Sequence, residues 1–298
     1  MTSSLPRGLG LWAGFLDRLP AADAAAGARE LEAAGVTTIW LQEYSGVDPF
    51  IRAAFYLGAT SRLTVALGVA TIHARDPEAM VAAASTLHEA FPGRFVLGLG
   101  VSHRHLTESR GHSYRAPLET MRAYLADMSA VARRRVLPPI FLGALGPRMT
   151  ELGAELTRGV HSYFSPVEHT AATRAAVGEG PWLAPTQLVC IGAAESEWRE
   201  RAREYFGLCL GMPNYRKNLR RFGFSDDDLN SVADRLLDAL AVPDEPLALR
   251  DRIAEHRAAG ADHLVLQFIP PPQADVVLRR ARDLNVFDPN QEGTLQWA

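Results

Sequence analysis

Residues 63–100 read LTVALGVATIHARDPEAMVAAASTLHEAFPGRFVLGLG, and this stretch decides the fold. It begins with an apolar, β-branched run at Leu63–Ala70 and ends with a second apolar run at Arg94–Gly100. Between them, Asp76-Pro77 opens an alanine-rich amphipathic segment. Aspartate caps a helix by accepting from an unpaired backbone N–H, and proline at the first helical position has no N–H to lose. The order strand, helix, strand predicts a parallel βαβ unit.

The same alternation continues in both directions along the chain. Capped helix starts recur at Asp48-Pro49 and Ser165-Pro166, where Glu168 is expected to complete a capping box with Ser165. Gly35 and Gly260 follow alanine pairs and predict helix ends. Eight strands are expected, the number that closes an α/β barrel. They are Gly8–Trp12, Val36–Gln42, Leu63–Ala70, Arg94–Gly100, Pro139–Gly143, Gly159–Tyr163, Thr186–Ile191 and His263–Phe268.

These elements predict one (β/α)8 TIM barrel of the α/β class, with a single domain over residues 1–298. A net charge of -3 with 22% charged residues disfavours nucleic-acid binding. The absence of a long apolar run disfavours a membrane span, and the N-terminal residues lack a signal-peptide pattern, so a cytoplasmic protein is expected.

Two connections are too long for simple turns. They run from Val101 to Pro117 after strand four and from Gly207 to Pro246 between strands seven and eight. Long insertions in a compact domain are usually lids or interfaces. The second insertion carries YRKNLRR at residues 215–221, which fits a solvated helix face and an anion-binding site equally well.

Catalytic groups of such barrels lie at the carboxyl ends of the strands. Three ionisable side chains stand there: Glu43, His73 and His103. Burial would raise the pKa of a carboxyl toward neutrality, and histidine titrates near neutrality. Each is a candidate acid or base, although Glu43 could instead pair with an arginine, and a histidine at a strand end can be merely hydrogen-bonded.

Glycine-rich segments end strands four and five. Gly98 and Gly100, and then Gly143 and Gly146, lack Cβ atoms where a flat ring would approach the backbone, although barrel taper could also require them. Pro147 predicts a helix start, so the free N–H groups there would form an anion site to which Arg148 could add charge.

Several chemistries lack their motifs. The segment from Gly98 has no third glycine for a dinucleotide fingerprint, and phosphate-loop, zinc-protease and α/β-hydrolase motifs do not occur. His103 and His105 have the spacing of a metal site, which leaves a metal-dependent hydrolase as a rival. A barrel of that kind would gather further ligands at other strand ends, so no metal site is predicted.

Taken together, the chain resembles the luciferase-like monooxygenase superfamily, and within it the branch that uses coenzyme F420. The resemblance rests on ARDP at 74–77, PGRFVLGLGVSH at 92–103, LGALGPRM at 142–149 and GADH at 260–263. It implies a cis peptide bond at Gly68-Val69 that supports the central ring of the cofactor. It also implies cofactor contacts from Gly68, Val69, Ala70, Thr71, Ser102, His103, Gly143, Ala144, Leu145, Gly146, Pro147 and Arg148.

The resemblance further implies hydride transfer between F420 and a small alcohol, carbonyl or activated alkene, with Glu43, His73 or His103 moving the proton. Many F420 relatives have Asp then His after strand two, whereas this chain has Glu43 then Tyr44. An FMN-dependent monooxygenase is the alternative, and a cofactor-binding protein without turnover is a third interpretation. Relatives are commonly homodimers, so a homodimer is expected.

Overall fold

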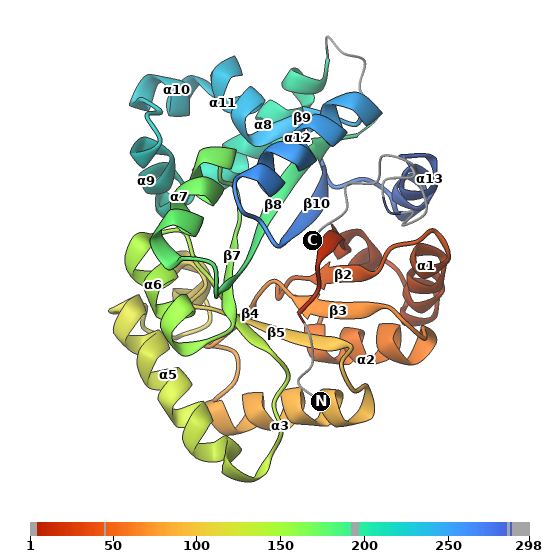
Figure 1. Cartoon of the computed structure of the whole chain (residues 1–298), viewed down its shortest axis with the longest axis vertical. Helices are drawn as coiled ribbons and strands as arrows, with labels where there is room; N and C mark the ends of the chain where they lie inside the picture. The colour runs from red at the N-terminus through yellow and green to blue at the C-terminus, as the bar shows by residue number, and fades with distance from the viewer. Residues whose placement is uncertain (1–4, 45, 192–196, 285–286, 288–298) are drawn as a thin grey trace.

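The computed structural model describes residues 5–44, 46–191, 197–284 and 287. Its strands form a closed barrel, because β10 pairs in parallel with both β1 and β8. Helices surround the strands (Figure 1). The predicted (β/α)8 architecture is confirmed.

The strands are β1 Gly8–Trp12, β2 Thr38–Leu41, β3 Thr64–Leu67, β4 Ala70–Thr71, β5 Phe95–Gly100, β6 Ile140–Gly143, β7 Gly159–Ser162, β8 Trp182–Cys190, β9 Ala241–Pro243 and β10 His263–Ile269. The helices that follow barrel strands are α1 Ala21–Ala33, α2 Pro49–Ala59, α3 Pro77–Ala90, α5 Pro117–Val131, α6 Pro147–Leu156, α7 Val167–Val177, α12 Pro246–Ala258 and α13 Ala274–Leu284. The remaining helices are η1 Gly14–Arg18, α4 Arg104–Glu108, η2 Ala132–Arg134, α8 Trp198–Leu210, α9 Pro213–Arg221, α10 Asp226–Ser231 and α11 Asp234–Leu240.

All eight predicted strands are present, and β8 differs most from its predicted bounds. It begins at Trp182, four residues before the predicted Thr186. Pro185 lies inside it, opposite Ser162 of β7. Proline cannot donate to a ladder, so the sequence pattern argued against a strand at this point.

Of the three helix caps predicted from the sequence, two are confirmed and one is wrong. Asp48 accepts from the N–H groups of Phe50 and Ile51, and Asp76 accepts from Ala79, as predicted. The capping box predicted at Ser165 is wrong. Pro166 is the N-cap of α7, so Ser165 lies one residue too early and donates instead to the hydroxyl of Ser162 at 3.2 Å.

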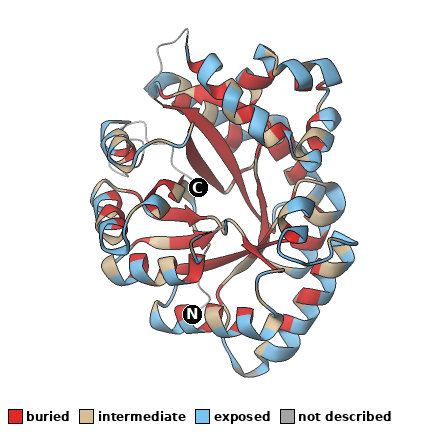
Figure 2. Cartoon of the chain, turned by 180° about the vertical axis from the view of Figure 1, so that it is seen from behind, coloured by how far each residue is buried: buried red, intermediate tan, exposed pale blue. Residues whose placement is uncertain are grey.

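Large aromatic side chains fill the interior of the barrel. Trp40 is fully buried at its centre and its ring lies 5.2 Å from Phe141 and 6.1 Å from Trp182, measured between centroids. Figure 2 shows the strands as the buried layer inside helices with exposed outer faces. Since these rings pack against one another, the barrel interior is filled, and barrels of this class bind their ligands at the carboxyl ends of the strands.

The second insertion builds a separate hydrophobic cluster at that end. Helices α8 to α11 bury Trp198, Phe206 and Leu219 against Phe164 after β7 and Ile269 of β10. The insertion begins earlier than Gly207, which lies inside α8. Among the described helices, none is long and apolar enough to cross a membrane.

Candidate active site

The chain changes direction between β3 and β4, where the Gly68-Val69 peptide bond is cis, as the resemblance implied. A Cβ on Gly68 would lie 2.6 Å from the ring of Trp40, so a larger residue would collide there. The side chain of Val69 fills the space beside two glycines. A Cβ on Gly100 would lie 2.3 Å from Val69 Cγ2, and one on Gly143 would lie 3.1 Å from Val69 Cγ1. The three residues form one packed unit from three strand ends.

This packing changes the interpretation of the glycines. Gly100 and Gly143 make room for Val69, and a Cβ on Gly98 would lie 2.1 Å from the carbonyl oxygen of Leu67. The steric requirement predicted as an alternative therefore holds at these positions. Gly146 differs from the other three glycines, because the nearest atoms to a Cβ at this position belong to a charged group, the guanidinium of Arg221.

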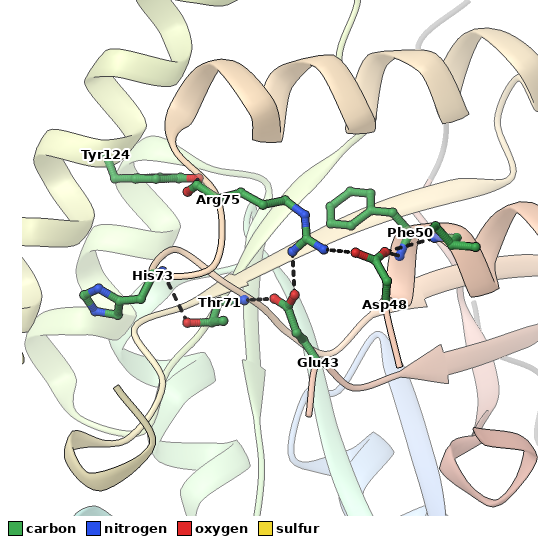
Figure 3. A network of polar contacts seen from close by, with 8 residues as sticks. Glu43, Asp48, Phe50, Thr71, His73, Arg75 and Tyr124 are labelled. Carbon is green, nitrogen blue, oxygen red and sulfur yellow. Dashed lines mark hydrogen bonds and ion pairs between the residues drawn. The ribbon is translucent and has the colours of Figure 1, made fainter. Parts of the chain in front are cut away.

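Glu43 is held by two partners (Figure 3). Its carboxylate accepts the backbone N–H of Thr71 at 2.7 Å and pairs with Arg75, which also pairs with Asp48. The Glu43 side chain is 6% exposed. Tyr124 adds a hydrogen bond from its hydroxyl to the carbonyl of Arg75 at 2.8 Å. The network fixes the segment after β4 to the end of β2.

His73 lies in the same segment, with its ring turned away from Glu43 (Figure 3). Its ring is 6.1 Å from that of His112 and 6.4 Å from that of Tyr114, between centroids. Partial burial and the neighbouring His112 lower the pKa of His73 below its usual value. The imidazole is therefore neutral at pH 7 and able to accept a proton.

His103 lies after β5, at the start of the first insertion. Its ring lies 5.6 Å from Tyr215 of α9 and 6.1 Å from His105. Burial, and then the field of His105, lower the pKa of His103. No described contact joins His103 to Glu43 or His73, so the three candidate residues form two separate groups at the mouth.

Two residues at strand ends adopt left-handed backbone conformations. Ser102 follows β5 with φ of 59°, and Phe164 follows β7 with φ of 54°. Such conformations cost on the order of 1–3 kcal/mol for residues with a Cβ and cluster at functional sites. Tyr215 of α9 packs against Phe164 at 5.4 Å and against His103, the residue after Ser102, at 5.6 Å, measured between ring centroids.

The segment from Gly143 to Arg148 joins β6 to α6. Pro147 begins α6 as predicted, and Gly146 is its N-cap without a side-chain cap. Ala144 and Leu145 lie between Gly143 and this helix start. Arg148 is exposed and lies 3.7 Å from Glu119 of α5. The cation near the helix start is instead Arg221.

A half-buried pair of tyrosine hydroxyls that was not among the predicted site residues lies beside the barrel core. Tyr163 and Tyr205 share a hydrogen bond, and Gln267 donates to the Tyr205 hydroxyl at 3.1 Å. Tyr163 also packs against Trp12, with ring centroids 5.7 Å apart. Two of these residues could have been predicted from strand alternation. Tyr163 and Gln267 each come two residues after a side chain that points into the barrel, His161 and Val265, and alternate residues of a strand face the same side. Tyr205 comes from α8, and its position had no sequence signal.

A family model for luciferase-like monooxygenases matches residues 13–263. The chain belongs to the luciferase-like monooxygenase family. The resemblance predicted from the sequence motifs is thus confirmed.

Two curated relatives and one solved structure illustrate the range of this family. A protein of Mycobacterium tuberculosis named as a coenzyme F420-dependent oxidoreductase is 29% identical over 227 residues, covering 67% of this chain and 64% of that protein. The 5,10-methylenetetrahydromethanopterin reductase of Methanolobus tindarius is 27% identical over 154 residues, covering 45% of this chain and 47% of the reductase. The chain therefore matches less than two thirds of the length of either relative.

The solved structure is the coenzyme F420-dependent tetrahydromethanopterin reductase of Methanopyrus kandleri. Its TM-score with this chain is 0.75 at 15% sequence identity, and the matched region covers 94% of this chain and 98% of the reductase. At this identity the likeness shows that the two chains share a fold.

Among the described residues, no group of three or more His, Cys, Asp or Glu side chains could hold a metal ion. Two buried side chains, Asn218 of α9 and Gln267 near the end of β10, have unpaired polar atoms. Buried polar atoms normally have partners, so these groups fit a ligand that offers hydrogen bonds.

Proposed function

We propose that this chain is an F420-dependent oxidoreductase that transfers a hydride between the deazaflavin and a small alcohol, carbonyl or activated alkene. The observation that carries the proposal is the 29% identity with a protein named as an F420-dependent oxidoreductase. The family membership and the strand-end geometry support it. When bound, the cofactor supplies the hydride acceptor that no amino-acid side chain offers.

The residues around Val69 would hold the ring of the cofactor. Val69 is fixed between Gly100 and Gly143, and Glu43 anchors the next residues through the Thr71 N–H. A support fixed from both sides presents one constant surface to a flat ring. Such preorganisation keeps the reacting atoms aligned.

His73 and His103 are better placed than Glu43 to move the proton. Both imidazoles are half-buried, and their lowered pKa values leave them neutral at pH 7. The carboxylate of Glu43 is occupied by Thr71 and Arg75. We assign Glu43 a positioning role and one of the two histidines the proton transfer.

Titration of the apoprotein with F420 and with FMN, followed by absorbance and fluorescence, tests the cofactor assignment. F420 is expected to bind more tightly than FMN. The FMN-dependent monooxygenase alternative predicts the reverse order and oxygen consumption with reduced FMN. Tight F420 binding, with no oxidation of any alcohol tested by F420 and no reduction of any carbonyl or alkene tested by reduced F420, would favour a binding protein.

We also propose a homodimer that uses the outer face of α2. Ile51 and Phe55 lie one turn apart on this helix and are 57% and 45% exposed, and the nearby Tyr44 is 59% exposed. Exposed apolar groups of this kind mark association surfaces. Light scattering on the wild type and on Ile51→Glu/Phe55→Glu tests the dimer. A monomeric wild type would refute it.

A further inference from the structure

The ring of Trp12 connects the proposed cofactor support to the tyrosine pair. A Cβ on Gly68 would lie 3.2 Å from the outer edge of this indole. Tyr163 packs on the same ring, with centroids 5.7 Å apart, and shares a hydrogen bond with Tyr205. Trp12 therefore lies between the cis peptide bond after β3 and the two tyrosine hydroxyls.

Gln267 lies on the wall of the barrel that faces this support. It is in β10, and the path from β10 to β5, where Val69 packs, passes β1, β2 and β3 in one direction and β8, β7 and β6 in the other. Val265, two residues before Gln267, packs in the cluster of Trp12 and Trp40 inside the barrel. Because alternate residues of a strand face the same side, Gln267 also points inward, one layer closer to the carboxyl end of β10.

The amide of Gln267 has a partner for its nitrogen but none for its oxygen. Nε2 donates to the Tyr205 hydroxyl at 3.1 Å, and that hydroxyl also bonds to Tyr163. Both tyrosine hydroxyls hydrogen-bond to Cys209 of α8 as well. Each phenol has one proton to donate, and these contacts use it. Among the described residues, Oε1 of Gln267 has no hydrogen-bond partner.

The surroundings of this oxygen favour a neutral ligand group. A buried acceptor without a partner is costly, and a ligand that donates to it removes the cost. Gln267 is 8% exposed, whereas Tyr163 and Tyr205 are half-buried, so the cluster reaches the protein surface. The groups that act on the two tyrosines are Cys209, Tyr215 and Gln267, and none of these is charged. An ammonium group would be buried here without a counter-charge, so a hydroxyl or an amide N–H fits better.

We propose that Gln267 is a specificity-determining residue whose Oε1 accepts a hydrogen bond from a hydroxyl or amide N–H on the part of the substrate that does not react. The inference rests on the proposed function and narrows its substrate class to alcohols, carbonyls or alkenes with a second, neutral hydrogen-bond donor. A reacting hydroxyl must give its only proton to the base, so it is not the donor to Gln267. Binding of the non-reacting part holds the substrate in place for hydride transfer.

The test uses two pairs of alcohols that differ by one hydroxyl: isopropanol with propylene glycol, and benzyl alcohol with para-hydroxybenzyl alcohol. The second hydroxyl is close to the reacting carbon in one pair and further away in the other. With F420 as the oxidant, kcat/KM is measured for each alcohol, and the ratio within a pair is compared between proteins. In Gln267→Met this ratio should fall about tenfold or more for at least one pair, because the apolar side chain has no acceptor.

Gln42→Met is the matched control. Gln42 is also a glutamine at a strand end, but its Oε1 already accepts from Trp12 at 3.2 Å. This variant should keep the wild-type ratio for both pairs. If Gln267→Met keeps the wild-type ratios too, the proposal is overturned. An equal loss of kcat/KM for both members of each pair would also overturn it, since a merely structural role affects both alike.

F420 titration separates this result from failure of the proposed function. If the wild type does not bind F420, the proposed function fails, and Gln267 is tested by ligand binding to the apoprotein. Para-hydroxybenzyl alcohol should then raise the thermal midpoint more than benzyl alcohol does, and Gln267→Met should remove the difference. If F420 binds but none of these alcohols is oxidised, the same comparison is made on the F420 complex. No difference between the two alcohols in the wild type would overturn the proposal.

Discussion

Trp40 donates a hydrogen bond from its indole nitrogen to Nε2 of His263, 3.1 Å away, and neither side chain has exposed surface. The bond requires Nε2 to be unprotonated. Burial, as the main cause, lowers the pKa of His263 to about 3. The barrel core therefore contains a histidine that must remain neutral.

We expect the free energy of unfolding to fall as the pH is lowered from 7 to 5. Burial lowers the pKa of His161 to about 4, of His256 to about 3 and of His263 to about 3. In the unfolded chain each titrates near pH 6.5, so below that pH the unfolded state binds more protons. Each histidine then removes about 1.4 kcal/mol of stability per pH unit. Urea unfolding at pH 7, 6 and 5 measures the effect.

Asp17 acts in the opposite direction. Burial raises its pKa to about 6, so its contribution to stability grows as the pH falls from 6 toward the ordinary value of 3.8. One carboxyl does not offset three histidines. A free energy of unfolding that stays constant or increases from pH 7 to 5 would show that the buried imidazoles are not neutral.

Replacing Arg75 by Ala should destabilise the fold. The substitution leaves the Glu43 carboxylate, 6% exposed, without its cation, and loss of one partner of a buried pair costs about 3 kcal/mol or more. Arg122→Ala is the control, because Arg122 pairs with Glu155 on the exposed surface. Urea midpoints should fall clearly for Arg75→Ala and hardly for Arg122→Ala. Equal midpoints would contradict the importance of the network.

Gly100→Ala should be destabilising, and Val69→Ala should rescue it. The new Cβ would lie 2.3 Å from Val69 Cγ2, and removal of the valine methyl groups leaves its nearest contact at 3.4 Å. Overpacking of this kind costs about 1–3 kcal/mol. Gly207→Ala in α8 has no atom within 4 Å of its new Cβ and serves as the control. Additive effects in the double-mutant cycle would refute the packing of Val69 against Gly100.

Substitution of the proton-transferring histidine should slow hydride transfer about a hundredfold or more in single-turnover experiments. His73→Ala and His103→Ala are compared, with Glu43→Gln as the variant that retains the acceptor for Thr71. For the histidine that acts as base, the rate should also fall as the pH drops through its pKa, because the protonated ring cannot accept. An unchanged rate after replacement of Glu43, His73 and His103 together would refute all three assignments.

The fold could be predicted well from the sequence, because the fold depends on local patterns of apolar and capping residues. Strand runs, Asp48-Pro49 and Asp76-Pro77 are each readable within a few residues. Glu43 was placed correctly at a strand end, but its partner Arg75 is 32 residues away and could be in any loop. Arg221 was seen as part of a basic run, and its position beside Gly146 depends on how the insertion folds. The tyrosine pair likewise joins segments 42 residues apart.

The crystal structure of the F420 complex tests the central claim most directly. We predict that the deazaflavin ring rests against Val69 at the carboxyl end of the barrel. A ring bound away from Val69, or no F420 bound at concentrations that saturate the protein's known relatives, would contradict the account.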